Sequence, residues 1–472
     1  MNEIDKTIIE ELASRVEELG GRAYMVGGAV RDEIMKRPIK DVDIEVHGIS
    51  GAILETVLKE LGKPLRFGSA FGVYSLAGHQ IDITLPRSER KAGNGHRDFE
   101  IEIDPFIGIK EAARRRDFTM NALLKDILSG EIADPYGGTE DIKNRIIRHI
   151  DDRKFGEDPL RALRAAQFRY RFGFQVAPST ISICRTLDLS SLSAERVEME
   201  MKKALLESNQ PSEFFECLRE MGQLGYWFQE LEQLIGLEQN PAFHPEGDVW
   251  THTMMVLDRA ARFRPCVSDP YAFMLLALTH DFGKITTTEF VNGAIHAYGH
   301  EIQGAEIAER FLDRVCHGNE IKRYIRNMLP NHMRPNKIAE SRSAVKKTNR
   351  LFDDVVAPSD LIYFAICDKP KLPHIMLSKE NKEDPSGLYT ESEKTREKER
   401  IDFLFDRLEI YKTMMSEPYV TGKDLINSGI TPGDDFSLIL EYAHKLRLAG
   451  IPKESALKQT ISYAVKLRKN NM

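Results

Sequence analysis

The segment from Tyr24 to Gly48 constrains the fold of this 472-residue chain more than any other part of the sequence. An apolar run at Tyr24–Val26 predicts a short buried strand that ends at the pair Gly27-Gly28. A helical piece follows the glycines, and Pro38 ends it because proline cannot continue a helix. Strand, glycine turn and helix in this order predict an α/β unit.

The chain then returns to an extended segment, DVDIEV, that begins at Asp41. Neighbours at i and i+2 in a strand share a face, so Asp41 and Asp43 point one way while Val42 and Ile44 point into the core. Two carboxylates side by side repel each other unless cations lie between them, and hard oxygen ligands suit Mg²⁺. Glycines ahead of a helix let backbone N–H groups approach an anion such as a triphosphate.

Composition sets the broad class of the protein. Hydrophobic residues make up 42% and charged residues 29% of the chain, the ordinary balance of a globular protein long enough for several domains. No apolar run predicts a membrane span, the acidic amphipathic N-terminus differs from a secretory leader, and five cysteines without a CxxC pair fit free thiols. We therefore expect a cytoplasmic protein. The net charge of −7 argues against non-specific coating of nucleic acid, although arginines crowd into residues 114–171 and could line a basic groove.

Two later segments carry charged side chains at helical spacing. In RRDFTMNA, residues 115–122, Arg116 suits a phosphate, while Asp117 and Asn121 would share a helix face that suits ribose hydroxyls. In EDPLRALR, residues 157–164, Asp158 and Arg161 lie on one helical face, where they can pair and offer acceptors and donors to the edge of a base. Each pattern alone also fits a helix cap or a surface ion pair.

A series of histidines and aspartates runs through the second half of the chain. Imidazole and carboxylate together suit a transition metal, and a metal there can supply hydroxide for attack on phosphorus. A single histidine is more often a hydrogen-bonded core residue, but the adjacent pair His280-Asp281 after an apolar helix favours a metal site. The series, expected in helices or at their ends, comprises His252, His280, Asp281, His296, His300, His332 and Asp368.

The order of the motifs resembles the class II nucleotidyltransferases, the tRNA CCA-adding enzymes and bacterial poly(A) polymerases of the polymerase-β-like superfamily. The residues that carry the resemblance are the glycine pair, the DxD, the RRDxTxNA string and the EDxxR string. The resemblance covers nearly the whole chain and is strongest over residues 24–205.

The resemblance implies a reaction and a role for each motif. A 3′-hydroxyl of tRNA would attack the α-phosphate of CTP or ATP and release pyrophosphate, without a nucleic-acid template. Asp41 and Asp43 would be the catalytic carboxylates that hold two Mg²⁺. The nucleotide would be bound by Gly27, Gly28, Arg31 and Arg116 at the triphosphate, by Asp117 and Asn121 at the ribose, and by Asp158, Arg161 and Arg164 on the base-reading helix.

The order H…HD…D resembles the HD phosphohydrolase domain. This resemblance implies a divalent transition metal, of unknown identity, whose four ligands are His252, His280, Asp281 and Asp368. His300 and His332 stand where two-metal members of that group carry further ligands, so a binuclear site is an open alternative.

The expected architecture has four parts. A polymerase-β-like α/β nucleotidyltransferase head over residues 1–150 precedes a helical neck and body over 151–240, an HD domain over 241–375, and a charged linker with a helical tail over 376–472 that would bind tRNA. Residues 86–98, which are polar, charged and glycine-bearing, are predicted to form a mobile loop beside the active site.

Three alternative functions stay open. An enzyme with the same head could add only A, only C or a poly(A) tail, although the modest C-terminal tail favours CCA addition. The chain could instead act mainly as an HD phosphodiesterase or phosphatase on RNA ends or nucleotides. A catalytically silent RNA-binding protein is disfavoured by the complete series of motifs.

Overall fold

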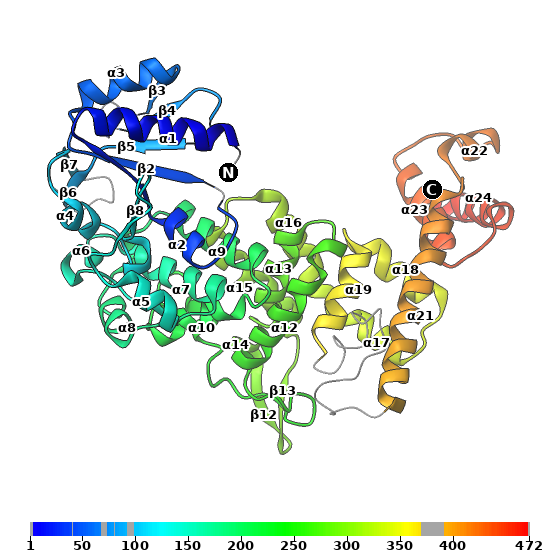
Figure 1. Ribbon diagram of the computed structural model, residues 1–472. Coiled ribbons are helices and arrows are strands. Elements are labelled where there is room, and N and C mark those ends of the chain that lie inside the picture. The colour runs from blue at the N-terminus through cyan, green and yellow to red at the C-terminus, as the bar shows by residue number, and fades with distance from the viewer. Residues whose placement is uncertain are drawn as a thin grey trace. The chain divides into compact units, whose positions relative to one another are not determined.

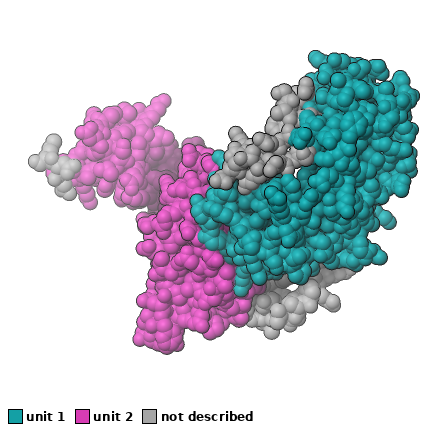
Figure 2. All heavy atoms as spheres, turned by 90° about the vertical axis from the view of Figure 1, so that its left-hand side faces the viewer, with its two compact units in different colours: residues 1–207, 213–227 teal, residues 208–212, 228–472 magenta. Residues whose placement is uncertain are grey.

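The computed structural model describes residues 3–39, 41–67, 73–79, 81–91, 99–369 and 391–470. Its contacts divide the chain into two compact units, residues 1–207 with 213–227 (unit 1) and residues 208–212 with 228–472 (unit 2), which Figure 2 colours separately. The predicted head and most of the predicted neck fall in unit 1, and the HD series and the tail fall in unit 2. The finer division into four domains stays a prediction.

Unit 1 begins with an α/β head. Its elements are α1 (Glu3–Glu18), β1 (Arg22–Val26), α2 (Gly28–Ile34), β2 (Val42–His47), α3 (Gly51–Leu61), β3 (Pro64–Phe67), β4 (Val73–Leu76), β5 (Ile81–Thr84), β6 (Arg87–Lys91), β7 (Phe99–Ile103), α4 (Ile109–Arg114), the 3-10 helix η1 (Thr119–Asn121), β8 (Leu124–Asp126) and β9 (Ile132–Ala133).

Seven of these strands form one mixed sheet in the order β3-β4-β5-β2-β1-β8-β9. The central pair β2–β5 is parallel, and the other neighbouring pairs are antiparallel. Helices α1 and α3 lie together along one face of the sheet (Figure 1), where Val16 and Leu54 pack with Ile44 and Ile83 in a buried apolar core. The predicted alternation of apolar and acidic residues in β2 is confirmed, since Val42 and Ile44 are buried while Asp43 is exposed.

The mobile loop predicted over residues 86–98 is wrong in part. Strands β6 and β7 pair as an antiparallel ladder, from Arg87 opposite Ile103 to Lys91 opposite Phe99. Residues 92–98 lie outside the described residues. Alternating polar and apolar residues in FEIEI carry the strand signal that the charged composition obscured.

A helical neck completes unit 1. Its elements are α5 (Gly138–Asn144), β10 (Ile146–Ile147), α6 (Asp152–Gly156), α7 (Leu160–Phe172), β11 (Gln175–Val176), α8 (Pro178–Cys184), η2 (Leu189–Ser191), α9 (Ala194–Glu207) and α10 (Ser212–Glu220).

Within unit 1, Phe118 joins the head to the neck by apolar contacts. Phe118 of the head is fully buried and meets Phe155 and Phe168 edge to face, with ring centroids 5.6 Å apart in both pairs. Aromatic pairs in this geometry add stabilisation beyond the burial of their area. The motif 115–122 is therefore anchored directly to α7, which ends at Gly173 in a left-handed conformation.

Unit 2 is almost entirely helical. Its elements are α11 (Gln229–Glu232), α12 (Val249–Phe263), η3 (Arg264–Cys266), α13 (Pro270–Thr279), α14 (Lys284–Thr287), β12 (Thr288–Val291), β13 (Ala294–Ala297), α15 (His300–Val315), α16 (Asn319–Met328), η4 (Leu329–Asn331), α17 (Arg334–Glu340), α18 (Val345–Asp354), α19 (Pro358–Cys367), α21 (Glu391–Ser416), α22 (Gly422–Asn427), α23 (Phe436–Leu448) and α24 (Lys453–Asn470).

Helix α13 lies at the centre of unit 2. Residues 271–279 are all buried, as expected for a helix that is apolar on every side, and α12, α16 and α19 pack around it. Helix α21 packs on α17, α18 and α19, and α22 to α24 have a small core of their own around Leu425 and Ile439. Within the described ranges, no helix has the length and apolar character needed to cross a membrane.

A close approach of backbones in unit 1 provides a test of this fold. Gly138, the first residue of α5, would place a Cβ 2.2 Å from the carbonyl oxygen of Thr119 in η1. Gly138→Ala is therefore expected to lower the free energy of unfolding by about 1–3 kcal/mol, because the backbone must shift to relieve the clash. Urea or thermal unfolding would measure this change.

The matched control is Gly156→Ala, also in a helix of unit 1. A Cβ there would meet no heavy atom closer than 3.9 Å. Because alanine is the better helix former, this variant is expected to be neutral or stabilised by less than about 1 kcal/mol. Equal losses in the two variants would contradict the close approach of α5 and η1.

Candidate functional sites

Three carboxylates gather near the starts of two neighbouring strands. Strand β5 pairs with β2 so that Asp82 lies directly opposite Asp43, and Asp41 precedes β2 on the same face. The surrounding protein removes part of the water from around the Asp43 carboxylate, which raises its pKa. Arg116 lowers this pKa, and the nearby Asp82 and Asp41 raise it. Exposed carboxylates that repel one another fit Mg²⁺, a hard cation that takes oxygen ligands.

The glycine turn lies against two guanidinium groups. Gly27 has φ +67° as the N-cap of α2, and a Cβ there would lie 2.6 Å from Arg116 Nη1. A Cβ at Gly28 would lie 3.4 Å from Arg31 Nη2. The four residues predicted for the triphosphate are thus brought together, at a turn where no side chain separates a phosphate from the arginines.

Arg31 serves this turn as a fixed support. Its Nε donates to Asp32 Oδ1 at 2.8 Å and its Nη1 donates to Asn121 Oδ1 at 2.6 Å, while its guanidinium carbon lies 4.7 Å from the centre of the Phe172 ring. Burial lowers the pKa of Arg31, although the charge of Asp32 opposes that shift. The side chain is therefore held from several sides, unlike a long arginine that reaches freely for a ligand.

Asp117 and Asn121 meet, but not on an α-helix. The helix predicted here is a single 3-10 turn, so the shared helix face is wrong, yet Asn121 Nδ2 donates to Asp117 Oδ1 at 2.9 Å. Arg164 Nε of α7 donates to Asp117 Oδ2 at 2.7 Å. Burial alone would raise the pKa of Asp117, but Arg164 and Asn121 hold it below its usual value. The carboxylate is thus kept ionised in a buried position.

The predicted ion pair between Asp158 and Arg161 is wrong, because each side chain has another partner. Arg196 Nη2 of α9 donates to Asp158 Oδ1 and Oδ2 at 3.2 and 3.0 Å. Arg161 donates to the carbonyl oxygens of Lys154 and Arg115 at 2.9 and 2.7 Å. Asp158 also precedes α7, so the two residues flank the start of that helix instead of lying along its face.

Glu45 is a site residue that the motif comparison did not single out. It is 1% exposed and lies two residues beyond Asp43 on β2. Its Oε1 lies 3.0 Å from His47 Nε2, and its Oε2 lies 3.3 Å from Arg115 Nη2 and 3.7 Å from Arg116 Nη2. Glu45 therefore holds Arg116 beside Asp43, one of the two carboxylates predicted to be catalytic. Because residues two apart on a strand share a face, the sequence alone could have placed Glu45 on the same face as Asp43.

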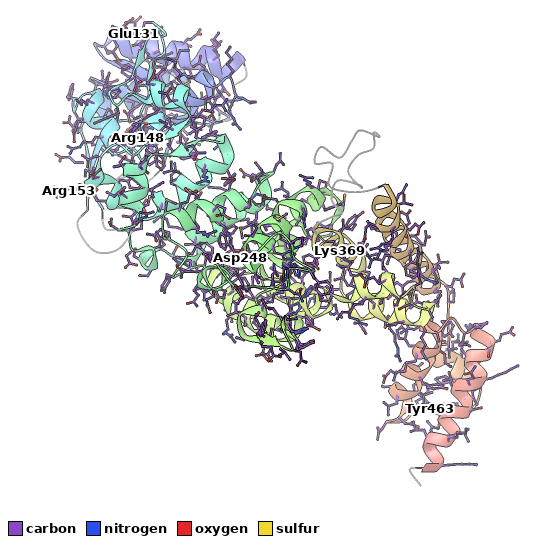
Figure 3. All side chains as sticks on the ribbon, turned by 90° about the horizontal axis from the view of Figure 1, so that it is seen from below. Glu131, Arg148, Arg153, Asp248, Lys369 and Tyr463 are labelled. Carbon is purple, nitrogen blue, oxygen red and sulfur yellow. The ribbon has the colours of Figure 1, made fainter. Side chains whose placement is uncertain are left out.

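Many arginines of the arginine-rich segment pair with acidic residues of unit 1. Arg114 pairs with Asp151 at 2.8 Å, and Arg148 pairs with Asp141 at 3.1 Å. Arg153 is exposed, and its side chain projects from the surface in Figure 3. Most of the predicted basic groove is therefore neutralised inside unit 1.

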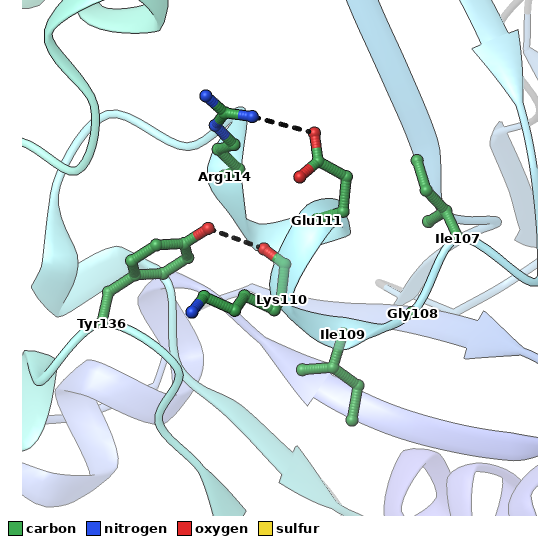
Figure 4. Close-up of a pocket in the computed structure, with 7 residues that line it drawn as sticks. All are labelled: Ile107, Gly108, Ile109, Lys110, Glu111, Arg114 and Tyr136. Atoms are coloured by element: carbon green, nitrogen blue, oxygen red, sulfur yellow. Dashed lines mark hydrogen bonds and ion pairs between the residues drawn. The ribbon is translucent and has the colours of Figure 1, made fainter.

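A cavity of about 490 Å³ lies under the start of α4 (Figure 4). The hydroxyl of Tyr136 donates to the carbonyl of Lys110 at 2.8 Å, and Arg114 Nη1 lies 3.6 Å from Glu111 Oε1. None of the residues at the glycine turn lines this cavity, so it is separate from the predicted nucleotide site.

At the second predicted site, in unit 2, four histidine rings share one orientation, with Nδ1 hydrogen-bonded and Nε2 directed at the site. Each Nδ1 is engaged by an acceptor, which fixes the ring and leaves Nε2 toward a common centre, the arrangement that metal-binding histidines require. The pairs are His252 with Glu246 Oε1 at 2.6 Å, His280 with the Ala277 carbonyl at 3.0 Å, His300 with the Ala297 carbonyl at 2.8 Å, and His332 with the Leu329 carbonyl at 2.7 Å.

The Nε2 atoms face two aspartates, of which Asp281 is buried and Asp368 is half-buried. His280 Nε2 lies 3.2 Å from Asp281 Oδ2, His300 Nε2 lies 3.5 Å from Asp281 Oδ1, and His252 Nε2 lies 3.2 Å from Asp368 Oδ1. The Nε2 atoms of His280 and His300 are buried without a hydrogen-bond partner, which is costly unless a cation satisfies them. Two triads can each hold a metal and share Asp281: His252, His280 and Asp281, and Asp281, His300 and His332.

The pKa values of two histidines at this centre couple the binding of a metal to pH. Burial alone would lower the pKa of His252, but hydrogen bonds to Asp368 and Glu246 raise it to about 9. Burial lowers the pKa of His332 to about 4. A metal at the first triad must displace the proton of His252, so metal affinity falls as the pH falls.

His296 does not join this centre. It lies on β13, so its predicted helical position is wrong, and its ring stacks on Tyr298. A cavity of about 770 Å³ opens at the centre and is lined by Asp281, His300, His332 and Asp368.

Comparison with known protein families identifies the head. The Poly A polymerase head domain matches residues 23–148, the part that holds the glycine turn, the carboxylates and the motif at 115–122. With the sheet and the helices described above, this match confirms the predicted polymerase-β-like head followed by a helical body.

A relative that aligns with about two thirds of the chain identifies its family. The "Multifunctional CCA protein" of Actinobacillus pleuropneumoniae serotype 5b is 37% identical over 326 residues, which are 68% of this chain and 77% of that protein. This chain belongs to that family of CCA-adding nucleotidyltransferases.

Solved structures show the same fold. A CCA-adding enzyme in complex with ATP aligns with a TM-score of 0.66 at 20% identity, over 99% of this chain and 95% of that one. The CCA-adding enzyme of Thermotoga maritima, complexed with tRNA, aligns with a TM-score of 0.63 at 20% identity, over 98% and 96%.

The buried Glu45 carboxylate predicts a pH-dependent stability. Burial alone would raise its pKa, but His47, Arg116 and Arg115 lower it from its usual 4.5 to about 2. A lowered folded-state pKa stabilises the protein above the unfolded-state value, and that stabilisation is lost as the pH falls from about 4.5 to about 2. The full contribution is about 3 kcal/mol.

Glu45→Gln is therefore expected to be less stable than the wild type at pH 7 by roughly 3 kcal/mol, because two arginines lose their counter-charge. The difference should shrink by about half at pH 3, because there the unfolded chain has bound a proton at Glu45 while the native carboxylate is still mostly ionised. Denaturant unfolding of both proteins between pH 7 and pH 3 measures it. A difference that stays constant over this range would show that the pKa of Glu45 is the same in the native and the unfolded protein, and would contradict its ionic contact with the arginines.

Proposed function

We propose that this chain completes the 3′ ends of tRNA by adding C and A nucleotides, taken from CTP and ATP, without a template. The observation that carries the proposal is the glycine turn between Arg31 and Arg116, placed beside the carboxylates of β2 and joined to α7. Membership in the multifunctional CCA protein family supports CCA addition over its A-adding, C-adding and poly(A)-adding alternatives.

Asp41 and Asp43 would hold the Mg²⁺ ions on which nucleotidyltransferases of this family generally depend. Such ions, when bound, lower the pKa of an attacking hydroxyl and neutralise the leaving oxygens. Arg116 would hold the triphosphate from the glycine turn, where Glu45 fixes its position. Phosphoryl transfer depends mainly on such positioning and on charge stabilisation.

Asp117 and Asn121 would hold the ribose, and the start of α7 would select the base. Because Arg196 holds Asp158 and two carbonyl oxygens hold Arg161, both groups keep a fixed direction without the ion pair expected from the sequence. A rigid set of donors and acceptors can select C or A by hydrogen bonds and reject a base that leaves them unpaired. The helical tail would bind the tRNA, and the cytoplasm is the proposed compartment.

The test uses purified protein, Mg²⁺ and a tRNA transcript that ends at the discriminator base, with products resolved at single-nucleotide length. We expect two additions with CTP alone and a third only when ATP is also present. A single A on a prepared CC end, or a long A ladder, would replace CCA addition by a sibling activity.

Asp43→Asn should lower the rate of addition by at least about 10³-fold, because it removes the negative charge of one carboxylate that would hold Mg²⁺ at the reacting phosphate. The matched control is Glu33→Gln, an exposed acid of α2 whose carboxylate pairs with Lys125 at 2.6 Å. It should add nucleotides at nearly the wild-type rate. Normal turnover by Asp43→Asn would remove the carboxylate mechanism.

We propose a second activity, hydrolysis of phosphate esters at the histidine-aspartate centre of unit 2. The observation that favours it is the pair of triads that share Asp281, with unpartnered Nε2 atoms facing the centre. The residues fit a divalent transition metal, which supplies hydroxide when bound. Lys284 Nζ lies 2.8 Å from Asp281 Oδ2 and would hold that carboxylate in its ionised form.

His280→Ala tests whether the two activities are separable. With Ni²⁺, Co²⁺ or Mn²⁺ supplied, this variant should lose hydrolysis of adenosine 2′,3′-cyclic phosphate, because one triad loses a ligand. It should still add CCA, because His280 lies outside unit 1. Unchanged hydrolysis in His280→Ala would remove the centre from the reaction.

A further inference from the structure

The cavity at the histidine-aspartate centre has aromatic side chains that the metal chemistry does not use. Phe243, His296 and Tyr298 line it together with the ligands His300 and His332. Phe243 is 74% exposed and Tyr298 is 68% exposed. Exposed aromatic rings that gather in one cavity, unlike single ones scattered over a surface, mark a ligand-binding groove.

The hairpin β12–β13 fixes two of these rings relative to the metal ligands. His300 Nδ1 donates to the carbonyl of Ala297 at 2.8 Å, and Ala297 lies between His296 and Tyr298. The rings of His296 and Tyr298 are stacked, with centroids 4.9 Å apart and planes 10° apart. One hydrogen bond therefore ties the stacked pair to a metal ligand.

A second loop brings Phe243 to the same centre. The adjacent His244 ring packs edge-on against the ring of His252, with centroids 4.7 Å apart. Aromatic surface thus borders the cavity from two separate segments, each attached directly to a metal ligand.

Cations border the same cavity. Lys337 is exposed at its wall, and Lys369 directly follows the ligand Asp368. Lys369 Nζ forms an ion pair with Glu340 Oε1 at 3.1 Å, so Lys337 is the more available of the two lysines for an anion. In one cavity, the flat rings match the base of a nucleotide, and the cation and the proposed phosphate-hydrolysing centre match its phosphate.

We propose that the stacked pair His296–Tyr298 is a nucleobase subsite of this centre. The base stacks on the Tyr298 ring while the ribose-bound phosphate reaches the metal ligands. This inference rests on the proposed hydrolase function of the same centre.

The reaction is a balanced hydrolysis. The oxygen of water forms a new bond to phosphorus, the bond from phosphorus to one ribose oxygen breaks, and a proton passes to that ribose oxygen. No oxidant or further reactant is needed. The base takes no part in the chemistry, so its contribution is to affinity.

The test compares two cyclic phosphates that differ only outside the reacting ring. Adenosine 2′,3′-cyclic phosphate carries a base, and glycerol 1,2-cyclic phosphate carries none. Tyr298→Ala should lower the ratio of their kcat/KM values about tenfold, through the KM of the adenosine substrate, because stacking on the ring is lost. Tyr298→Phe, which keeps the ring, should restore most of that ratio.

The matched control is Phe290→Ala on β12 of the same hairpin. Phe290 is also 74% exposed but does not line the cavity. Its substitution should leave the ratio unchanged. An equal fall for both substrates in Tyr298→Ala, or an equal change in Phe290→Ala, would overturn the base subsite and leave a centre that recognises phosphate alone.

A binding measurement separates the subsite from the hydrolase function. Titration of the full chain with adenosine 2′-monophosphate in the presence of Zn²⁺ should show an affinity that falls about tenfold in Tyr298→Ala and not in Phe290→Ala. If the wild type hydrolyses neither cyclic phosphate with any metal, the hydrolase function fails, and this titration alone decides the subsite. Unchanged affinity in Tyr298→Ala would overturn it.

Discussion

The nucleotide end of unit 1 depends on one buried ionic contact, between Glu45 of β2 and the paired arginines at 115 and 116. A carboxylate that is 1% exposed is stable only because these guanidinium groups and His47 surround it. In return, the carboxylate fixes Arg116 at the glycine turn, and the carbonyl of Arg115 accepts a hydrogen bond from Arg161. A single acidic side chain thus connects β2, which carries the carboxylates proposed for catalysis, to the helix that would select the base.

Helix α7 extends the same network across unit 1. Arg164 binds Asp117, Asp117 binds Asn121, and Asn121 accepts from Arg31 of α2. Beneath these polar contacts, Phe118 packs on Phe168 of the same helix. The parts proposed for triphosphate, ribose and base therefore form one preorganised body. Enzymes that choose a nucleotide without a template need this rigidity, because protein atoms must hold the geometry that a paired base would otherwise supply.

Local sequence patterns predicted the parts of the molecule that local forces decide. The period-two alternation of β2, the glycine turn and the apolar helix before His280-Asp281 all follow from neighbours along the chain, and the structure confirms them. The partners of Asp158 and Glu45 could not be predicted in this way. Asp158 pairs with Arg196, 38 residues away, and Glu45 binds Arg115, 70 residues away. The choice of partner is made by tertiary packing, which also placed His296 on a strand.

The alternation of β2 has a consequence for how this protein can change over time. Asp43 and Glu45 face the site because their side chains alternate with Val42 and Ile44 in the core, and register has a period of two. Loss or gain of one residue inside this strand would exchange the two faces for all residues on one side of the change, so that carboxylates there would enter the core and aliphatic side chains would enter the site. A substitution changes one side chain, whereas a deletion changes the direction of several. The length of this strand is thus constrained more strictly than its composition.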